Sequence, residues 1–434
     1  MATHKIEFNT AVSIVIANMI GTGVFTSLGF QVMGIQNPAA IIALWLIGGI
    51  LALCGALTYG EIGSAFPESG GEYNYLSKLY HPAVGFLSGW VSITVGFAAP
   101  IAAASVALGS YISKIYTQVN PLYLAIAIII LITIIHSYTL KAGAAFQRVF
   151  TLVKIICIVM FVGFGCFHVP NHEISFSVNQ NTLSSIFSVS FASSLIYVTY
   201  AYSGWNAAAY ISGEMIEPKK NLPRALLVGT LVVMIVYTAL NAIFLYSVPI
   251  DELKGVLEVG YLSANKIFGN HLGQFMSLVI AILLISTISA MILTGPRVMQ
   301  SMGKNINGLN FFAKTNKNNV PFIAIIFQSA IALILVCTSS FESLINYVGF
   351  TLNIFTLLTV FGVFILRKRF KTQNNGYKTF LYPITPLLFI GILLWVLINT
   401  FISKTTESIA GLGTVMAGLG IYYLTNRKKV TSKL

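Results

Sequence analysis

The chain has 434 residues, of which 56% are hydrophobic and only 9% are charged. This composition, without a polar stretch long enough to form a soluble domain, is typical of a protein that crosses a membrane many times. The net charge of +13 does not indicate a nucleic-acid partner, because most lysines and arginines fall in short loops on one side of the predicted spans.

The sequence predicts membrane helices wherever a stretch stays apolar over the ~20 residues that a span requires. Twelve ranges meet this condition: 10–33, 39–66, 82–113, 121–138, 143–167, 183–214, 223–247, 271–300, 320–338, 341–366, 380–402 and 407–425. The excess of basic residues in alternate loops predicts that both termini face the cytoplasm. We therefore expect an all-α polytopic membrane protein, with residues 1–434 forming one transport domain.

The first predicted span contains Gly21-Thr22-Gly23 near its middle. Glycines at this depth free backbone N–H and C=O groups, which are tolerated only where the chain lines a cavity or meets a ligand. A half-helix ending near Ile20 would present carbonyls to a cation. A half-helix beginning near Val24 would present N–H groups to an anion. The alternative is that the glycines only permit close helix packing.

Two carboxylates lie at predicted cytoplasmic ends of spans, Glu61 in the second and Glu214 in the sixth. We expect them to pair with basic loop residues, with Arg148 or Arg224 opposite, and so to latch a cytoplasmic gate. The loop that begins at Ser69-Gly70-Gly71-Glu72 is expected to form part of the same gate.

Lys154 is the charged residue that lies clearly inside a predicted span, the fifth. Ionisable groups at membrane depth are costly and indicate a function. The expected partners of Lys154 are carbonyls freed near Gly21 and the hydroxyls of Ser286 and Ser289 in the eighth span. The alternative is a lysine that extends to the membrane surface, since Arg148 marks an edge only ~9 Å away.

The sixth predicted span is interrupted in the same way as the first, at Ala201-Tyr202-Ser203-Gly204-Trp205-Asn206. Paired interruptions at corresponding positions of two halves point to the binding site of a transporter. Two such breaks facing each other would hold a zwitterion by both ends and leave its side chain to a separate pocket. Asn206, just after the break, is a further hydrogen-bonding candidate.

Four segments carry a family resemblance: IGTGVF in the first span, YGEIGSAFPESGGEYNYL after the second, YAYSGWNAAAYISGEMIEPKKNLPRAL around the sixth and SAMILTGPRVMQSMG in the eighth. They resemble permeases of the amino acid–polyamine–organocation superfamily, and within it bacterial amino acid permeases related to the L-type exchangers. The resemblance implies a leucine-transporter-type fold with helices 1 and 6 broken. Its inverted repeats of five helices would be 10–167 and 183–366, with two extra helices within 380–425. It also implies location in the bacterial inner membrane.

The resemblance further implies how a substrate would be held. Its carboxylate would meet the N–H groups of Thr22 and Gly23, and its ammonium the carbonyls of Met19, Tyr200 and Ser203. Tyr200 would also close over the substrate as a gate, unless it is simply a packed core tyrosine. The expected substrate-binding residues are Met19, Ile20, Gly21, Thr22, Gly23, Val24, Tyr200, Ala201, Ser203, Gly204 and Asn206.

Lys154 also resembles a fifth-span lysine that replaces a bound sodium ion in sodium-independent members of the family. This implies transport without sodium. A lysine that cycles its proton would couple transport to protons, whereas one that stays charged would fit obligatory exchange. The sequence does not choose between these two.

The expected function is sodium-independent transport of neutral L-amino acids by alternating access, as an exchanger or a proton symporter. Neutral substrates are expected because no acidic residue or arginine is placed in the presumed pocket. The alternatives are a cationic amino acid or polyamine carrier of the same fold, and a receptor that binds an amino acid without moving it. We expect no enzyme activity and no metal, because no H-E-x-x-H motif, pair of membrane carboxylates or Cys/His cluster is present. We also expect no cofactor and no partner subunit.

Overall fold

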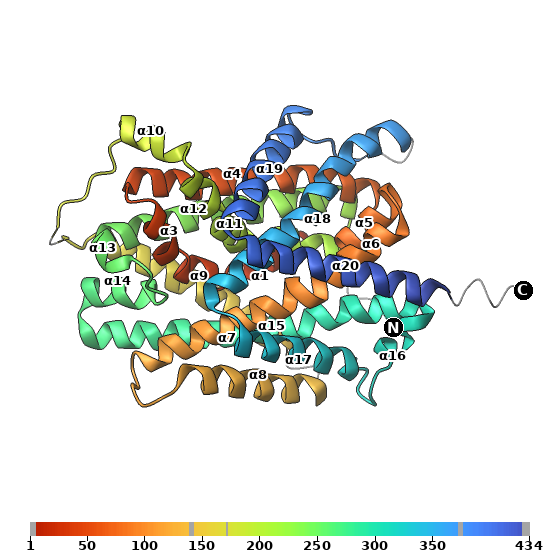
Figure 1. Ribbon diagram of the computed structural model, residues 1–434, viewed down its shortest axis with the longest axis horizontal. Helices are drawn as coiled ribbons and strands as arrows, with labels where there is room; N and C mark the ends of the chain where they lie inside the picture. The colour runs from red at the N-terminus through yellow and green to blue at the C-terminus, as the bar shows by residue number, and fades with distance from the viewer. Residues whose placement is uncertain (1–5, 139–142, 171, 372–375, 428–434) are drawn as a thin grey trace, which may run out of the picture.

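The computed structural model describes residues 6–138, 143–170, 172–371 and 376–427. Within these ranges the regular structure is helical, apart from one parallel bridge between Ile6 and Met215. Several long helices, among them α4, α7, α8 and α15, run along the long axis of the molecule, whereas α18 and α19 cross it obliquely (Figure 1). The predicted all-α class is confirmed.

The first half of the described chain begins with an interrupted helix and continues with longer ones. Asn37 begins α4 by accepting the backbone N–H of Ala40, with Pro38 at the first helical position. The elements are α1 (Phe8–Met19), α2 (Gly23–Thr26), α3 (Leu28–Gly34), α4 (Pro38–Ala65), α5 (Gly71–Leu79), α6 (Pro82–Val91), the π-helix η1 (Ser92–Phe97), α7 (Ala98–Ser113), α8 (Pro121–Tyr138) and α9 (Gly143–Gly165).

The second half is also interrupted near its start, and Ser188 caps α11 by accepting the N–H of Phe191. The elements are α10 (Gln180–Ile186), α11 (Val189–Tyr202), the 3-10 helix η2 (Ala207–Glu214), α12 (Pro218–Ser247), α13 (Ile250–Leu253), α14 (Val259–Phe268), α15 (Asn270–Asn305), the 3-10 helix η3 (Asn307–Leu309), α16 (Asn310–Ala313), α17 (Phe322–Thr338), α18 (Phe341–Arg369), α19 (Ile384–Ser403) and α20 (Thr405–Arg427).

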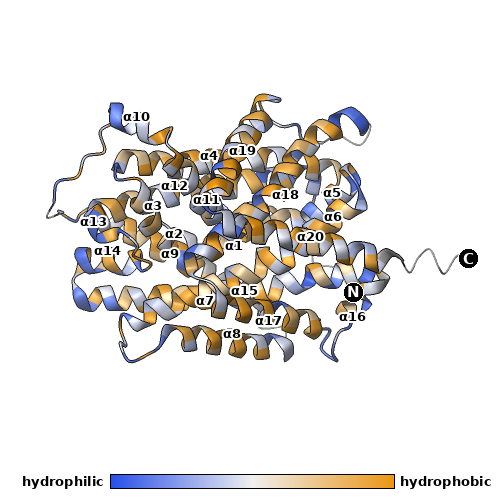
Figure 2. Cartoon of the chain, viewed as in Figure 1, coloured by the Kyte–Doolittle hydropathy of each residue, from blue (hydrophilic) through white to orange (hydrophobic). Residues whose placement is uncertain are grey.

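The described residues contain 9 helices long and apolar enough to cross a membrane, and 10 when α10 and the bent segment after it are joined across their 65° angle. Two shorter apolar helices, Leu152–Gly165 and Phe322–Thr338, lie where the fifth and ninth spans were predicted. Apolar residues cover the long helices, and polar residues gather toward the ends (Figure 2). The chain is therefore a multi-pass membrane protein, and the count of twelve remains a prediction.

Both ends of the described chain lie at the end of the molecule that carries α5, α6 and α16, opposite α3, α13 and α14 (Figure 1). Ile6 donates its N–H to the carbonyl of Glu214, next to the point where Gly70 donates to Tyr210. We call this end the α5 end. Its arrangement agrees with termini on one side of the membrane.

The two interrupted segments lie in the middle of the bundle, among the long helices. α1 and α4 both pack against α12, and α11 packs against α4, α18 and α19. α15 packs against α7, α9 and η1. This surrounding of continuous helices holds the irregular backbone away from lipid, as a broken membrane helix requires.

Candidate functional site

The first glycine segment interrupts the helix, as predicted. α1 ends at Met19, and Ile20 leaves the helical conformation with φ −74° and ψ 88°. α2 begins at Gly23, and the first N–H groups of a helix have no partner within it. The break therefore exposes main-chain acceptors on one side and donors on the other.

The second glycine segment is interrupted too. α11 ends at Tyr202, and Ser203 takes φ −54° and ψ 148°. Gly204 has φ 94°, in the left-handed region that favours glycine, and a Cβ there would lie 2.8 Å from the carbonyl oxygen of Asn18. The chain resumes as the 3-10 helix η2, so it stays tightly wound beyond the break.

The two breaks touch each other. The Thr22 hydroxyl lies 3.0 Å from the Tyr200 hydroxyl. A Cβ on Gly23 would lie 2.6 Å from the Cα of Ala201, so the two main chains are in direct contact there. The expectation that the breaks face one another is met by these contacts.

A cavity of about 310 Å³ lies between the breaks and extends toward the α5 end. Most of the expected binding residues line it: Met19, Gly21, Thr22, Gly23, Tyr200, Ala201, Ser203, Gly204 and Asn206. Ile20 and Val24 do not line it, because their side chains point into the apolar core with 1% and 0% exposure. Among side chains, the wall also carries the hydrogen-bonded pair Asn353 and Thr199, 3.0 Å apart.

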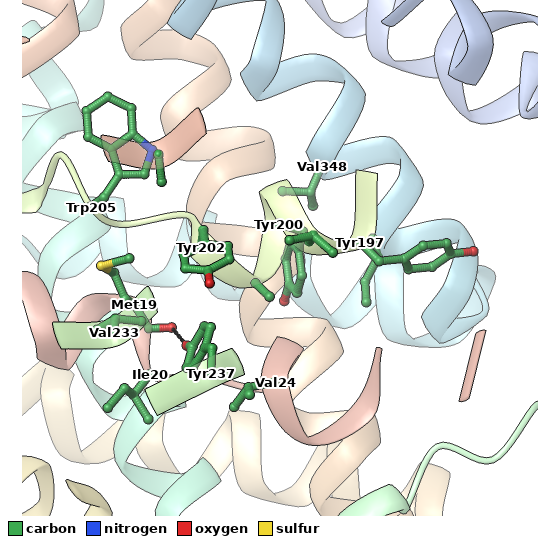
Figure 3. Close-up of a cluster of buried hydrophobic side chains, with 14 of the residues drawn as sticks. Met19, Ile20, Val24, Tyr197, Tyr200, Tyr202, Trp205, Val233, Tyr237 and Val348 are labelled. Carbon is green, nitrogen blue, oxygen red and sulfur yellow. Dashed lines mark hydrogen bonds between the residues drawn. The ribbon is translucent and has the colours of Figure 1, made fainter. Parts of the chain in front are cut away.

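Several carbonyls at the breaks already accept hydrogen bonds. The Tyr237 hydroxyl donates to the carbonyl of Met19 at 2.5 Å (Figure 3). The carbonyl of Tyr200 accepts the N–H of Ser203 at 3.0 Å. A carbonyl oxygen has two lone pairs, so each of these can still accept a second donor. Tyr237 was not predicted from the sequence, because nothing in an apolar helix pattern marks a single tyrosine as a hydrogen-bond donor to a carbonyl far away in the chain.

Three aromatic residues pack together where α3, α11 and α18 meet. The ring of Phe30 stacks on Tyr197, with centroids 5.9 Å apart, and on Phe341 at 5.8 Å. The Tyr197 hydroxyl and the Lys404 ammonium both donate to Glu342 Oε1, at 2.9 and 2.6 Å. None of these side chains lines the cavity, and Figure 3 shows the Tyr197 ring directed away from Tyr200. This aromatic cluster joins α3, α11 and α18 outside the cavity wall.

Lys154 is buried, with 2% exposure, so it does not extend to the membrane surface. Its Nζ donates to the carbonyl of Ile20 at 3.1 Å and to the Thr287 hydroxyl at 2.8 Å. The carbonyl partner agrees with the expectation. The expected hydroxyl partners, Ser286 and Ser289, do not bond to Lys154. Thr287, which lies between them on α15, supplies the hydroxyl instead.

Ser289 and Ser286, both on α15, point elsewhere. The Ser289 hydroxyl lies 2.7 Å from His136 Nε2 on α8, and the buried Ser286 hydroxyl has no hydrogen-bond partner among the described residues. The 3.6-residue turn of an α-helix separates neighbouring positions by about 100°, so only Thr287 faces α9. The depth of these hydroxyls could be predicted from the sequence, but their direction could not.

Glu61 pairs with Arg367, not with either of the expected arginines. Its carboxylate, fully buried, accepts Arg367 Nε at 2.9 Å and an Arg367 terminal nitrogen at 2.8 Å, together with the N–H of Thr379 at 2.8 Å. The guanidinium also lies 3.5 Å over the ring of Tyr382. The expected partner Arg224 makes no such contact, and the side chain of Arg148 lies outside what the structure describes.

Arg367→Ala is expected to lower the free energy of unfolding by about 3 kcal/mol, because it removes the guanidinium that is paired with a buried carboxylate. The double variant Glu61→Ala/Arg367→Ala is expected to be more stable than the single one, since it removes that charge. Thermal melting of the purified protein measures both. A single variant that melts with the wild-type protein would contradict this account of the pair.

The other expected gate residue, Glu214, is exposed at the end of η2. Its carbonyl accepts the N–H of Ile6, and its side chain has no ion pair among the described residues. The backbone of Glu214 is thus bonded to the N-terminal segment at Ile6. Among the described residues, the Glu214 carboxylate forms no ion pair that would latch a gate.

Glu72 is a cavity residue that the sequence did not reveal, and the expected absence of acidic residues from the pocket is wrong. Gly70 and Gly71 have φ 122° and 51°, which turns the chain back toward η2. The Glu72 side chain enters the wall of the cavity with 4% exposure and accepts Asn206 Nδ2 at 3.0 Å. Burial raises the pKa of this carboxyl group.

Arg297 of α15 lines the same cavity, so the expectation that no arginine stands there is also wrong. Glu72 and Arg297 are the charged side chains of the wall as far as the structure describes it. No group of three metal-ligating side chains occurs among the described residues.

Comparison with known proteins gives matches along nearly the whole chain. A family model described as "Amino acid permease" matches residues 6–424. The serine/threonine exchanger SteT of Bacillus subtilis (strain 168) is 33% identical over 428 residues, covering 97% of this chain and 96% of that protein. Large neutral amino acids transporter small subunit 2 of Homo sapiens is 25% identical over 433 residues, covering 97% and 80%. The b(0,+)-type amino acid transporter 1 of Mus musculus is 26% identical over 447 residues, covering 98% and 90%.

Proposed function

Since the chain belongs to the amino acid permease family of the amino acid–polyamine–organocation superfamily, we propose that it is a sodium-independent secondary transporter of neutral L-amino acids. It works by alternating access, as an exchanger or a proton-coupled symporter. The observation that carries this proposal is the contact of two broken helices around one cavity, with Gly23 against Ala201.

The proposed architecture has twelve spans in the bacterial inner membrane, with both termini in the cytoplasm. Residues 10–167 and 183–366 form two inverted repeats of five helices, and 380–425 hold two further helices. Support comes from the breaks after Met19 and Tyr202, which fall in the first helix of each half. The chain works without a partner subunit in this proposal.

In the proposed complex, the carboxylate of the amino acid accepts the N–H groups of Thr22 and Gly23, where α2 begins. The ammonium donates to carbonyls of Met19, Tyr200 and Ser203, with the Tyr237 hydroxyl beside the first of these. Tyr200 closes over the substrate and is held by Thr22. Main-chain dipoles would thus bind the ends that all L-amino acids share.

The side chain of the substrate is left to the wall formed by α11 and α18. Asn353 and Thr199 offer polar groups there, and Val348 and Gly349 offer a small apolar surface. A relative named for serine and threonine exchange supports small neutral substrates. Lys154, bonded to the carbonyl of Ile20, supplies the fixed positive charge that makes sodium unnecessary.

A second candidate is a carrier of cationic amino acids or polyamines, because Glu72 places a carboxyl group on the cavity wall. Competition of labelled alanine uptake separates the two proposals. Serine and threonine are expected to compete, and arginine and putrescine to compete weakly. Strong competition by putrescine would favour the second candidate.

Uptake is expected to proceed at the same rate in sodium and in choline buffers, because a covalent ammonium occupies the place of the ion. A separate measurement distinguishes exchange from proton symport: efflux of preloaded alanine from proteoliposomes, with and without external alanine, at two pH values. Efflux only in the presence of external alanine indicates exchange, and efflux driven by a pH gradient indicates proton symport. A saturable sodium requirement would refute the proposed role of Lys154.

A further inference from the structure

The cavity extends well beyond the two breaks, and its far part is chemically different. Around the breaks the wall consists of main-chain groups and hydroxyls, as at Thr22 and Tyr200. Toward the α5 end it carries Glu72 and Arg297. A cavity of about 310 Å³ is of the size that holds drug-sized ligands, so a small amino acid at the breaks leaves room beyond it.

Glu72 is held in place from several sides. Gly70 donates its N–H to the carbonyl of Tyr210, and the Ser69 hydroxyl accepts the N–H of Gly213. A Cβ on Gly71 would lie 2.8 Å from the Tyr210 ring, so the turn before Glu72 packs directly on η2. The carboxyl group is therefore fixed in the wall and is not a mobile surface side chain.

The polar contacts of Glu72 leave part of its bonding capacity unused. Oε1 accepts the Tyr59 hydroxyl at 2.5 Å and Asn206 Nδ2 at 3.0 Å, and the Thr356 hydroxyl of α18 is a third hydrogen-bonding neighbour. An ionised carboxylate offers about four lone-pair positions, so three donors leave one position open. The side chain is buried, and a buried carboxylate is strongly stabilised by an arriving cation.

Asn206 connects this carboxyl group to the second break. It follows Gly204 by two positions, and its amide donates to Glu72. A cationic group that leaves the carbonyls at the break therefore meets the Glu72 carboxylate next along the cavity. Arg297, which also lines the cavity, repels such a group and favours the carboxylate of a zwitterion.

We propose that the α5 end of the cavity is a second binding site, for a primary ammonium group, with Glu72 as its acceptor. This proposal rests on the proposed transport function and adds to it a second binding position for the substrate beyond the breaks. The ammonium has two possible sources, the α-ammonium of a neutral amino acid in transit and the side chain of a cationic substrate. Both present the same donor group.

The ammonium site requires an ionised Glu72, which gives it a pH dependence. The titratable groups that face Glu72 are Tyr59 of α4, Tyr75 of α5 and Tyr210 of η2, and the charged group that shares the cavity wall with it is Arg297 of α15. Tyrosine side chains keep their protons between about pH 5 and about pH 8. Because burial raises the pKa of Glu72, amine binding is lost as the pH falls through that raised value.

The test uses propylamine, which carries an ammonium without a carboxylate, and propionate as the opposite control. Propylamine is expected to raise the melting temperature of the purified protein and to inhibit alanine exchange, and propionate to do neither. In Glu72→Gln the apparent affinity for propylamine falls at least about tenfold and its pH dependence disappears. The glutamine oxygen can still accept the hydrogen bonds of Tyr59 and Asn206.

Glu68→Gln is the matched control, because Glu68 lies four positions before Glu72 but is exposed and bonded to Lys78 and Asn74. It is expected to bind propylamine as the wild-type protein does. If Glu72→Gln fails to fold, Tyr59→Phe decides, since it removes one donor to the carboxylate and shifts amine binding to higher pH. Equal propylamine affinity in wild type and Glu72→Gln, or no shift in Tyr59→Phe, overturns the proposal.

Two arms identify the source of the ammonium. A higher KM for alanine in Glu72→Gln, measured from the α5 end, assigns the site to the α-ammonium. Weaker inhibition by arginine and putrescine, with the alanine KM unchanged, assigns it to a cationic side chain. Because melting with propylamine does not require transport, failure of alanine exchange in the wild-type protein refutes the proposed function alone.

Discussion

Gly23→Val is expected to abolish amino acid binding while the protein still reaches the membrane. A Cβ at Gly23 would lie 2.6 Å from the Cα and 2.7 Å from the Cβ of Ala201. These atoms belong to the opposite break, so the valine must push the two breaks apart, which removes the main-chain groups from the geometry that the zwitterion needs. Equilibrium binding of labelled alanine is expected to weaken by about 100-fold or more.

Gly204→Leu is expected to give the same loss for an additional reason. Gly204 has φ 94°, which an L side chain rarely adopts, and its Cβ would lie 2.8 Å from the Asn18 carbonyl oxygen. Strain of this kind costs about 1–3 kcal/mol before the contact itself is counted.

Two further glycines provide controls for these variants. At Gly21, in the same break, the nearest atom to a Cβ is a Thr287 methyl carbon at 3.7 Å, an ordinary contact, so Gly21→Ala is expected to weaken binding far less than Gly23→Val does. Nothing lies within 4 Å of a Cβ at Gly413 on α20, so Gly413→Val tests membrane insertion alone. Wild-type affinity in Gly23→Val and Gly204→Leu would remove the proposed site.

The positions of the breaks were predictable from the sequence. Clustered glycine and polar residues in an apolar span free backbone groups that hydrocarbon cannot satisfy, so they mark an interruption that lines a cavity. The first half-helix was expected to extend through Ile20 and ends at Met19, and the second was expected from Val24 and begins at Gly23. Composition and spacing thus located the main-chain part of the candidate site closely, since it depends on local backbone chemistry.

The side-chain partners were less predictable, because they depend on how helices are turned and which helices are neighbours. Sequence depth suggested Ser286 and Ser289 for Lys154, whereas the rotation of α15 presents Thr287. Glu61 is joined to Arg367 across more than three hundred positions of the chain, and no local pattern marks such a pair.

Glu72 shows a third limit of the sequence. The segment was predicted to begin a loop after the second span, whereas Gly71 and Glu72 begin the helix α5, and a carboxylate outside the spans is usually solvated. Only the left-handed turn at Gly70 and Gly71 sends the side chain into the cavity, where Tyr59 and Asn206 receive it. Positive φ values at a Gly-Gly pair are expected, but the direction of the chain after them is set by its packing on η2.

Lys154→Ala is expected to slow alanine exchange by about tenfold or more, with a smaller effect on alanine binding. The lysine ammonium joins the Ile20 carbonyl, at the end of α1, to Thr287 on α15. Without it the carbonyl released by the break loses its cation, and the spacing between these helices is no longer held in the state that binds substrate. The proposed consequence is slower conversion between the states that open to either side.

The matched control is Val153→Ala, since Val153 is the neighbouring residue on α9 and is 39% exposed. It is expected to exchange alanine at the wild-type rate. Thr287→Val should give an intermediate rate, because the ammonium keeps its bond to Ile20 and loses the 2.8 Å contact to the hydroxyl. The rates are measured by alanine counterflow in proteoliposomes. An unchanged rate in Lys154→Ala would mean that this buried charge stabilises the fold without serving transport, and the argument against sodium coupling would then lose its structural basis.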